Sequence, residues 1–379
     1  MRFKGIIICA FLLGCSQDHD EPDFEMNLQK NALMLKVDNQ TSNISRGLQG
    51  KVLDSNEFLI SVSWKQNSLQ IYDLDSEKIH REIFFEEQGP NGIGNIFGYE
   101  VKNFDSIYLF PQFNKEIIHT DSSGTIRDRI TYSPPATFTP AFVHNSYFLS
   151  SPVFFQDKML VKTHIMGNYR EITQKELSET PMGYFIDMKT GKTTVTDFTY
   201  PQDYLSQGLK SFEYSMAESN DRVVYSFFGD HRLFYTNKAA KNTLQSVNAK
   251  SKYLDKLPVF PADGERQATY DYLFASDRYE SLLFDPFRNI FYRIAIPAVD
   301  YQEEEGLSQF KLAPRRFVVM ALDKELNVIG EYLLDSNTYL PGNIFVGRKG
   351  LYLSTSHPKN PDNKEDFMIF DCLIVSSAE

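Results

Sequence analysis

Short apolar runs separated by polar turns recur along most of the chain. The clearest example is residues 58–85, FLISVSWKQNSLQIYDLDSEKIHREIFF, which reads as a strand, a polar turn, a second strand, a tight turn and a third strand. Runs of four to eight residues rich in β-branched and aromatic side chains, bounded by Asp, Asn, Gly or Ser, are typical of strands joined in hairpins. The pattern predicts an antiparallel all-β protein.

One part of this hairpin repeats, namely an apolar strand that ends in Asp or Asn and is followed by a short polar turn. The six copies end at Asp73, Asp121, Asp187, Asn237, Asp323 and Asp371. Three of the intervals are close to 50 residues, and two are lengthened by insertions. Such a period is typical of blades of four antiparallel strands, so six copies predict a six-bladed β-propeller. A seven-bladed propeller and a pair of sandwiches are the alternatives.

The last copy leaves little chain for a full blade, because only residues 372–375 after Asp371 read as a strand. We therefore expect an early strand, from residues 33–38 or 52–55, to complete the last blade and close the ring. Residues 27–37 are compatible with a short helix or a first strand. The predicted organisation is a lipoprotein signal peptide at 1–14, an acidic tether at 15–30 and a propeller domain at 31–379.

The N-terminus has the features of an export signal. Arg2 and Lys4 precede a short apolar stretch, residues 6–13, which has signal-peptide length and is too short to span a bilayer. The stretch ends in Leu-Leu-Gly-Cys15, which resembles the bacterial lipoprotein signal, in which cleavage leaves the Cys as a diacylated N-terminus carrying lipid such as palmitate. An ordinary secretory signal with an unrelated Cys is the alternative. The resemblance predicts a membrane partner through a lipid anchor at Cys15.

Acidic residues follow Cys15 in the sequence SQDHDEPDFE. This stretch resembles the signal that directs Bacteroidota lipoproteins to the cell surface, although charged segments are also common as solvated linkers. The predicted location is the outer membrane, either at the cell surface or facing the periplasm.

The amino-acid composition limits the kinds of partner and of covalent bond that we expect. The net charge is −11 and no run of Lys or Arg offsets it, so nucleic acid is not an expected partner. The aromatic share of 14% favours strands. If Cys9 is removed and Cys15 is acylated, Cys372 remains alone and no internal disulfide can form. Cys372 lies in the apolar run 367–375, where a small core residue is expected.

Insertions and one hairpin are the candidate binding surfaces. Residues 133–147, 167–180, 258–267 and 298–312 break the repeat, and long loops on one face of a repeat fold usually carry binding. The hairpin YESLLFDPFRNIFYR, residues 279–293, interleaves arginines with aromatic rings. Its side chains could form a clamp for an anion with a stacking wall. In the alternative, the arginines cover the outer face and pair with Glu280 or Asp285. The candidate ligand-binding residues are Tyr279, Glu280, Asp285, Arg288, Tyr292, Arg293, Arg315 and Arg316, the last two expected in a neighbouring strand.

Motifs for catalysis are missing from the sequence. It contains no G-x-S-x-G, no C-x-x-C and no two His at H-x-x-x-H spacing. The loop EQGPNGIG, residues 87–94, lacks a phosphate-binding motif, and the loop 357–366 has oxygen ligands without EF-hand spacing. We predict no catalytic residues, no metal and no cofactor, and favour a protein that is not an enzyme.

Several features together resemble one family. The lipoprotein signal, the six Asp-turn units, the EQGPNGIG loop, and the segments DPFRNIFYR and HPKNPDNKEDFMIF resemble the domain-of-unknown-function 4221 family of Bacteroidota lipoproteins over nearly all of the mature chain. The resemblance implies a propeller-like fold and a cell-envelope address, but no catalytic residues. We expect a binding or scaffold module that recognises a protein, peptide or glycan with its loop-rich face. The alternatives are a hydrolase or lactonase-like enzyme with a site in the central channel, and a structural subunit of an envelope complex.

Overall fold

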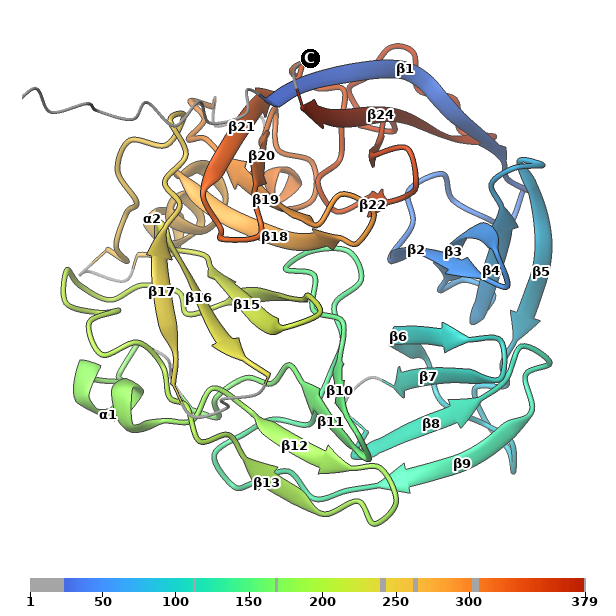
Figure 1. Cartoon of the computed structure of the whole chain (residues 1–379), viewed down its shortest axis with the longest axis horizontal. Coiled ribbons are helices and arrows are strands. Elements are labelled where there is room, and N and C mark those ends of the chain that lie inside the picture. The colour runs from blue at the N-terminus through green and yellow to red at the C-terminus, as the bar shows by residue number, and fades with distance from the viewer. Residues whose placement is uncertain are drawn as a thin grey trace, which may run out of the picture.

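The computed structural model describes residues 24–111, 114–167, 170–238, 243–261, 265–301 and 307–377. Six sheets of four antiparallel strands form a ring, which confirms the predicted six-bladed β-propeller (Figure 1). In each of the first five blades the chain runs from the axis to the rim, so the first strand of the blade is innermost. Among the described residues no helix is long and apolar enough to cross a membrane.

The strands of blades 1 to 3 are β2 (Leu48–Leu53), β3 (Asn56–Ser63), β4 (Ser68–Asp73) and β5 (Lys78–Phe84); β6 (Ile96–Asn103), β7 (Ser106–Pro111), β8 (Glu116–Thr120) and β9 (Ile126–Thr131); and β10 (Val153–Phe155), β11 (Lys158–Val161), β12 (Tyr184–Asp187) and β13 (Thr193–Val195). Those of blades 4 to 6 are β14 (Tyr214–Glu218), β15 (Arg222–Phe227), β16 (Arg232–Asn237) and β17 (Gln245–Asn248); β18 (Arg278–Asp285), β19 (Ile290–Ile296), β20 (Val318–Leu322) and β21 (Val328–Leu333); and β22 (Ile344–Val346), β23 (Leu351–Ser354), β24 (Phe367–Ser377) and β1 (Phe24–Lys36). The helical segments are α1 (Gln174–Glu179), α2 (Arg266–Tyr270), the π-helix η1 (Asp271–Ala275) and the 3-10 helix η3 (Leu307–Lys311).

The repeated Asp or Asn marks one place in each of the first five blades, the turn between the third and fourth strands. Its side chain organises the turn in several copies. The Asp73 carboxylate accepts a hydrogen bond from the Ser76 N–H at 2.8 Å, and the Asp187 carboxylate accepts one from the Thr190 N–H at 2.8 Å. These bonds replace backbone pairing at the end of the sheet, which is why this residue type recurs with the blade period.

The ring is closed by the N-terminal strand. β1 pairs with β24 from Phe24 opposite Ser377 to Lys36 opposite Phe367 and forms the rim of blade 6. Of the two expected closing segments, the one near residues 33–38 is therefore confirmed. The segment 52–55 was wrong, because Val52 and Leu53 belong to the innermost strand of blade 1. β1 also begins at residue 24, so the last part of the predicted tether, residues 24–30, lies in the propeller.

The sixth Asp has a different role, because its strand pairs with the N-terminal segment. Asp371 lies within β24, opposite an irregularity in β1 where Asn31 has a φ of 50°. Its buried carboxylate accepts hydrogen bonds from the Asn31 N–H at 2.7 Å and from the Tyr339 hydroxyl at 2.5 Å. The Lys30 ammonium donates to the Tyr339 hydroxyl at 2.7 Å. This latch fixes β1 to the blade that it completes.

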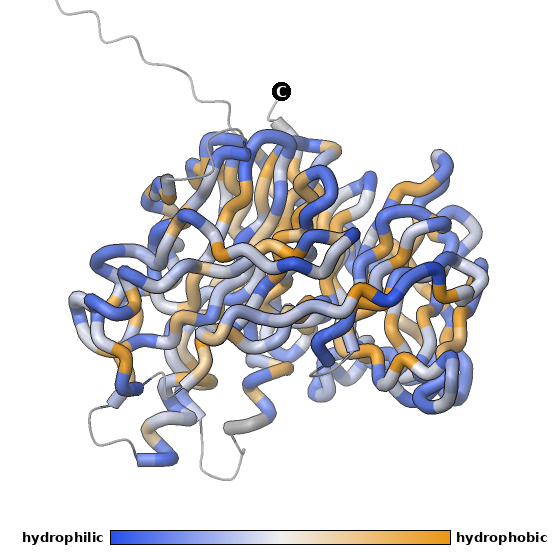
Figure 2. Tube along the Cα trace, turned by 90° about the horizontal axis from the view of Figure 1, so that it is seen from below, coloured by the Kyte–Doolittle hydropathy of each residue, from blue (hydrophilic) through white to orange (hydrophobic). Residues whose placement is uncertain are grey.

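Apolar faces of neighbouring blades pack against each other around the ring. Figure 2 shows hydrophobic stretches of the trace inside the molecule and hydrophilic ones along many of the bends at its edges. Cys372 is buried between blades 6 and 1, and burial raises the pKa of its thiol to about 11. The prediction of a small core residue is confirmed.

The centre of the ring is occupied by the chain itself. Residues 143–150, which precede β10, cross the axis and contact distant blades: the Leu48 N–H donates to the Asn145 carbonyl at 3.1 Å, and the Met216 N–H donates to the Leu149 carbonyl at 3.0 Å. A Cβ at Gly98 in β6 would lie 2.2 Å from the carbonyl oxygen of Val143, so this close approach requires glycine. This segment thus fills the centre of the ring, which is where the alternative of an enzyme with a site in the central channel would place that site.

The two faces of the ring differ. The segments that enter each innermost strand, and those that join the second and third strands, lie on one face, which we call the loop face. Because β24 is the third strand of its blade, it runs away from the loop face. Phe24 and Ser377 therefore pair at the opposite face.

Candidate ligand-binding site

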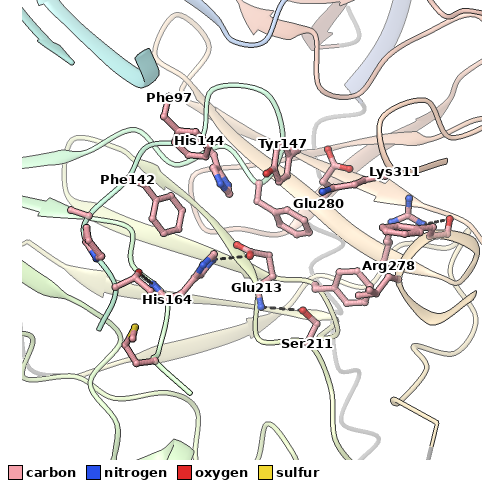
Figure 3. A pocket seen from close by; sticks show the side chains of 18 of the residues that line it. Phe97, Phe142, His144, Tyr147, His164, Ser211, Glu213, Arg278, Glu280 and Lys311 are labelled. Carbon is pink, nitrogen blue, oxygen red and sulfur yellow. Dashed lines mark hydrogen bonds and ion pairs between the residues drawn. The ribbon is translucent and has the colours of Figure 1, made fainter. Parts of the chain in front are cut away.

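A cavity on the loop face has a volume of about 640 Å³. This lies within the ~300–1,000 Å³ range of small-ligand sites. Most of its wall is apolar, and six aromatic rings contribute to it: Phe97, Phe142, Tyr147, Phe148, Phe228 and Phe274. We call it the aromatic pocket (Figure 3).

Four blades supply this pocket. Phe97 comes from the innermost strand β6, Phe142 and Phe148 come from the segment before β10, Phe228 follows β15, and Phe274 belongs to η1. The insertions at 133–147 and 298–312 line it, as expected for long loops. The described residues of the insertions at 167–180 and 258–267 do not line it, although Phe260 packs against Tyr272 at 4.0 Å between centroids and so supports η1.

One wall holds a compensated charge network. The Lys162 ammonium pairs with the Glu213 carboxylate, whose other oxygen lies 2.9 Å from His164 Nε2. Burial acts to raise the pKa of Glu213, but the Lys162 charge and the His164 hydrogen bond lower it overall. Burial lowers the pKa of Lys162, and burial followed by the Lys162 charge lowers that of His144. Because Glu213 already holds two partners, this network positions the wall and leaves no free acid.

A different carboxyl has one oxygen without a partner among the described residues. Glu280, from the start of β18, is only 4% exposed and lines the aromatic pocket, and its Oε1 has no hydrogen-bond partner within the described part of the chain. Burial raises the pKa of Glu280 to about 7, although the Arg278 charge and the Ser281 hydroxyl oppose this shift. A buried polar atom without a partner is costly, so it points to a ligand group that completes it.

The cations beside Glu280 do not pair with it. The guanidinium of Arg278 donates instead to the carbonyls of Phe274 at 3.0 Å, Ser276 at 3.2 Å and Phe310 at 3.3 Å. These bonds tie η1 and η3 to the pocket.

The ammonium of Lys311 is a second charged group at the wall of the aromatic pocket. This ammonium lies 5.3 Å from the Tyr147 ring centroid and forms no ion pair within the described ranges. The Glu280 charge also acts on the Tyr147 hydroxyl. A carboxyl with one unpartnered oxygen and an ammonium without an ion pair among the described residues thus both lie near Tyr147, beside the rings (Figure 3).

Among the eight candidate residues from the sequence, the structure brings only Glu280 to this cavity. Tyr279, Asp285, Tyr292 and Arg293 are buried inside blade 5. Arg288 pairs with Asp285 at 2.7 Å, which matches the alternative interpretation of the hairpin. Arg315 and Arg316 lie in the segment before β20 rather than in a strand, and neither lines the pocket.

Arg293 shows why the hairpin is not a surface clamp. Its guanidinium lies 3.3 Å from the Tyr279 ring centroid and donates to the Ser226 hydroxyl at 2.9 Å, and to the carbonyls of Asp230 at 2.7 Å, His231 at 2.8 Å and Ala249 at 2.9 Å. The side chain joins blade 5 to blade 4 and is not available to a ligand.

Metal ligation finds no support in the described ranges, where no group of three or more His, Cys, Asp or Glu side chains could hold an ion. The loop 357–366 is a loop tip, in which Asn363 accepts a hydrogen bond from Asn43 at 2.7 Å.

Comparison with known proteins agrees with this fold. The family model described as domain of unknown function (DUF4221) matches residues 25–333. The chain is similar to the crystal structure of a DUF4221 family member from Bacteroides vulgatus, with a TM-score of 0.82, 22% identity, and coverage of 93% of this chain and 99% of that chain. It is also similar to a protein from Bacteroides fragilis that is inferred to be exported, with a TM-score of 0.54, 11% identity, and coverage of 94% and 96%. No curated protein matches the chain. At these identities the likeness concerns the fold alone.

Proposed function

The chain belongs to the DUF4221 family, a family of unknown function, and on that premise we propose that it is an envelope-anchored binding protein for a small, amino-acid-like molecule. The ligand is a zwitterion with an apolar or aromatic side chain, and it occupies the aromatic pocket. The observation that carries this proposal is the Glu280 carboxyl, whose buried oxygen has no partner among the described residues.

The pocket offers one complementary group for each part of such a ligand. The ammonium of the ligand donates to Glu280, a charge-assisted hydrogen bond of about 1.5–3 kcal/mol. Its carboxylate faces the ammonium of Lys311, and its side chain packs among the six rings, where burial contributes about 1.5–3 kcal/mol. A ligand with only one charge would leave either Glu280 or Lys311 unpaired.

Three related probes separate these contributions in thermal melts at pH 8, where Glu280 is ionised. L-Phenylalanine carries both charges, phenethylamine lacks the carboxylate, and 3-phenylpropionate lacks the amine. We expect L-phenylalanine to raise the Tm most, because a ligand bound only by the folded state stabilises it. Glu280→Gln lowers the gain from L-phenylalanine and phenethylamine, whereas Lys311→Gln lowers the gain from L-phenylalanine and 3-phenylpropionate.

Lys189→Gln is the matched control, since it removes an exposed cation from a turn at the opposite face and leaves all three gains unchanged. The proposal fails if L-phenylalanine gives no gain, or if its gain is the same in Glu280→Gln.

Anchoring through lipid at Cys15 is the second part of the proposal. The signal sequence supports it, and so does the export inferred for the Bacteroides fragilis neighbour. Because the propeller begins at Phe24 on the face opposite the pocket, an anchor before this residue directs the loop face away from the outer membrane. Cells fed radiolabelled palmitate should label the wild-type chain and not Cys15→Ser. Equal labelling of both, or of neither, contradicts the anchor.

A further inference from the structure

The second cavity on the loop face lies beside the aromatic pocket but has different chemistry. Its volume is about 550 Å³, and it is formed by segments of blades 1, 5 and 6 together with Ser146. Residues 309–313 separate the two cavities, because Lys311 faces the aromatic pocket whereas Phe310 and Leu312 line the second. We call it the basic pocket.

Charge is the first indication of its ligand. Arg46, Lys65 and Lys359 line the basic pocket, and none of the described residues that line it is Asp or Glu. Asp38 acts electrostatically with Lys65 from outside the lining, but its carboxylate already accepts a hydrogen bond from the Gln40 N–H at 2.9 Å. In a chain with a net charge of −11, a cavity with only basic groups is a local site for an anion.

A flat apolar surface is the second indication. Trp64, in the turn between β3 and β4, is 47% exposed, and the Arg46 guanidinium lies 5.5 Å from its ring centroid. Arg46 forms no ion pair within the described ranges. The indole is thus open to a ring of the ligand, next to a fork of donors that suits a carboxylate or sulfate.

An unpartnered acceptor is the third indication. The Oδ1 atom of Asn337 is buried, has no hydrogen-bond partner among the described residues, and belongs to a residue that lines the pocket. A hydroxyl of the ligand would supply the donor that this oxygen lacks. Short hydroxyl side chains, Thr41, Ser42, Ser63 and Ser146, line the same cavity. These groups match a ligand with several hydroxyls rather than a flat aromatic acid.

We infer that the basic pocket binds an acidic saccharide. One sugar ring packs on Trp64, a carboxylate or sulfate on the ring faces Arg46 and Lys65, and a hydroxyl donates to Asn337. This ligand is separate from the one proposed for the aromatic pocket.

The chain contains a single Trp, which lines this pocket, so its fluorescence can follow binding here. We would titrate the protein in 0.15 M NaCl with trigalacturonate, with a sulfated chondroitin disaccharide, with neutral maltotriose and with AMP. Trigalacturonate or the sulfated disaccharide should give a saturable change, and binding of trigalacturonate would show that a carboxylate is sufficient. Maltotriose should bind at least tenfold more weakly.

Two variants complete the test, with calorimetry where the fluorophore is removed. Arg46→Gln and Trp64→Ala should each weaken binding of the acidic saccharide about tenfold, the effect of losing one charge-assisted or stacking contact. Lys189→Gln, at the opposite face, should leave it unchanged. The inference is overturned if neither acidic sugar binds, if maltotriose binds equally well, if AMP binds more tightly, or if Arg46→Gln has no effect.

Discussion

The sequence and the structure give Arg293 different roles, and the two roles predict different effects on stability when the residue is replaced. In the sequence it is a candidate for ligand binding, and in the structure it is a fully buried bridge between blades 4 and 5. Arg293→Met keeps much of the volume and removes every donor. The carbonyls of Asp230, His231 and Ala249 then lose bonds of 2.7–2.9 Å.

The cost follows from these lost bonds. A buried acceptor left unsatisfied costs about 1–3 kcal/mol, so the three carbonyls together would cost about 3–9 kcal/mol. Relaxation of the site and the lower desolvation of Met offset part of the sum. We therefore expect Arg293→Met to lower the free energy of unfolding by about 3–5 kcal/mol. Arg293→Lys should recover little of this, because a compact ammonium cannot reach three separated carbonyls at once.

Urea unfolding followed by far-UV circular dichroism measures this difference directly. Arg316→Met is the control, since Arg316 is exposed and its replacement should change stability by no more than about 0.5 kcal/mol. A loss below about 1 kcal/mol in Arg293→Met would refute the structural role of this residue.

Two further predictions follow from buried polar groups. Tyr339→Phe removes the hydroxyl that links Lys30 to Asp371, so the free energy of unfolding should fall by about 1–3 kcal/mol. Tryptic cleavage in β1 should also become faster. An unchanged rate of cleavage would contradict the latch. The folded-state pKa of Glu280 is raised to about 7, chiefly by burial, so its stabilising contribution is fully present below the ordinary pKa near 4.5 and is lost as the pH rises through about 7. Measured against Glu280→Gln, the wild type should lose up to about 3 kcal/mol of stability between pH 4.5 and pH 8, and a pH-independent difference would show that the pKa of Glu280 is not raised.

The fold could be predicted because local chemistry repeats with the blade. A strand that ends in Asp or Asn needs only its own turn to be recognisable, and five of the six copies mark the same turn. Closure was also predictable in outline, since the last blade lacked a strand. The role of Asp371 was not, because its partners Asn31 and Tyr339 come from other parts of the chain.

The site was harder to predict for a geometric reason. The aromatic pocket combines side chains from Phe97 to Lys311, which only the ring brings together. The insertion 133–147 gave a usable signal for part of the wall, whereas Phe228 and Phe274 gave none. The hairpin 279–293 resembled a surface strand because its polar and apolar side chains alternate. In the structure, however, β19 is buried along its whole length. Arg293 of this strand is therefore an interior partner of backbone carbonyls.

The central claim is that Glu280 completes its hydrogen bonding with the ammonium of an amino-acid-like ligand. The most direct measurement is a crystal structure of the protein soaked with 4-bromo-L-phenylalanine, with the bromine located by anomalous scattering. The account predicts bromine among the rings of the aromatic pocket and the ammonium about 2.7–3.0 Å from Glu280 Oε1. Bromine outside this pocket, or an ammonium turned away from Glu280, would contradict it.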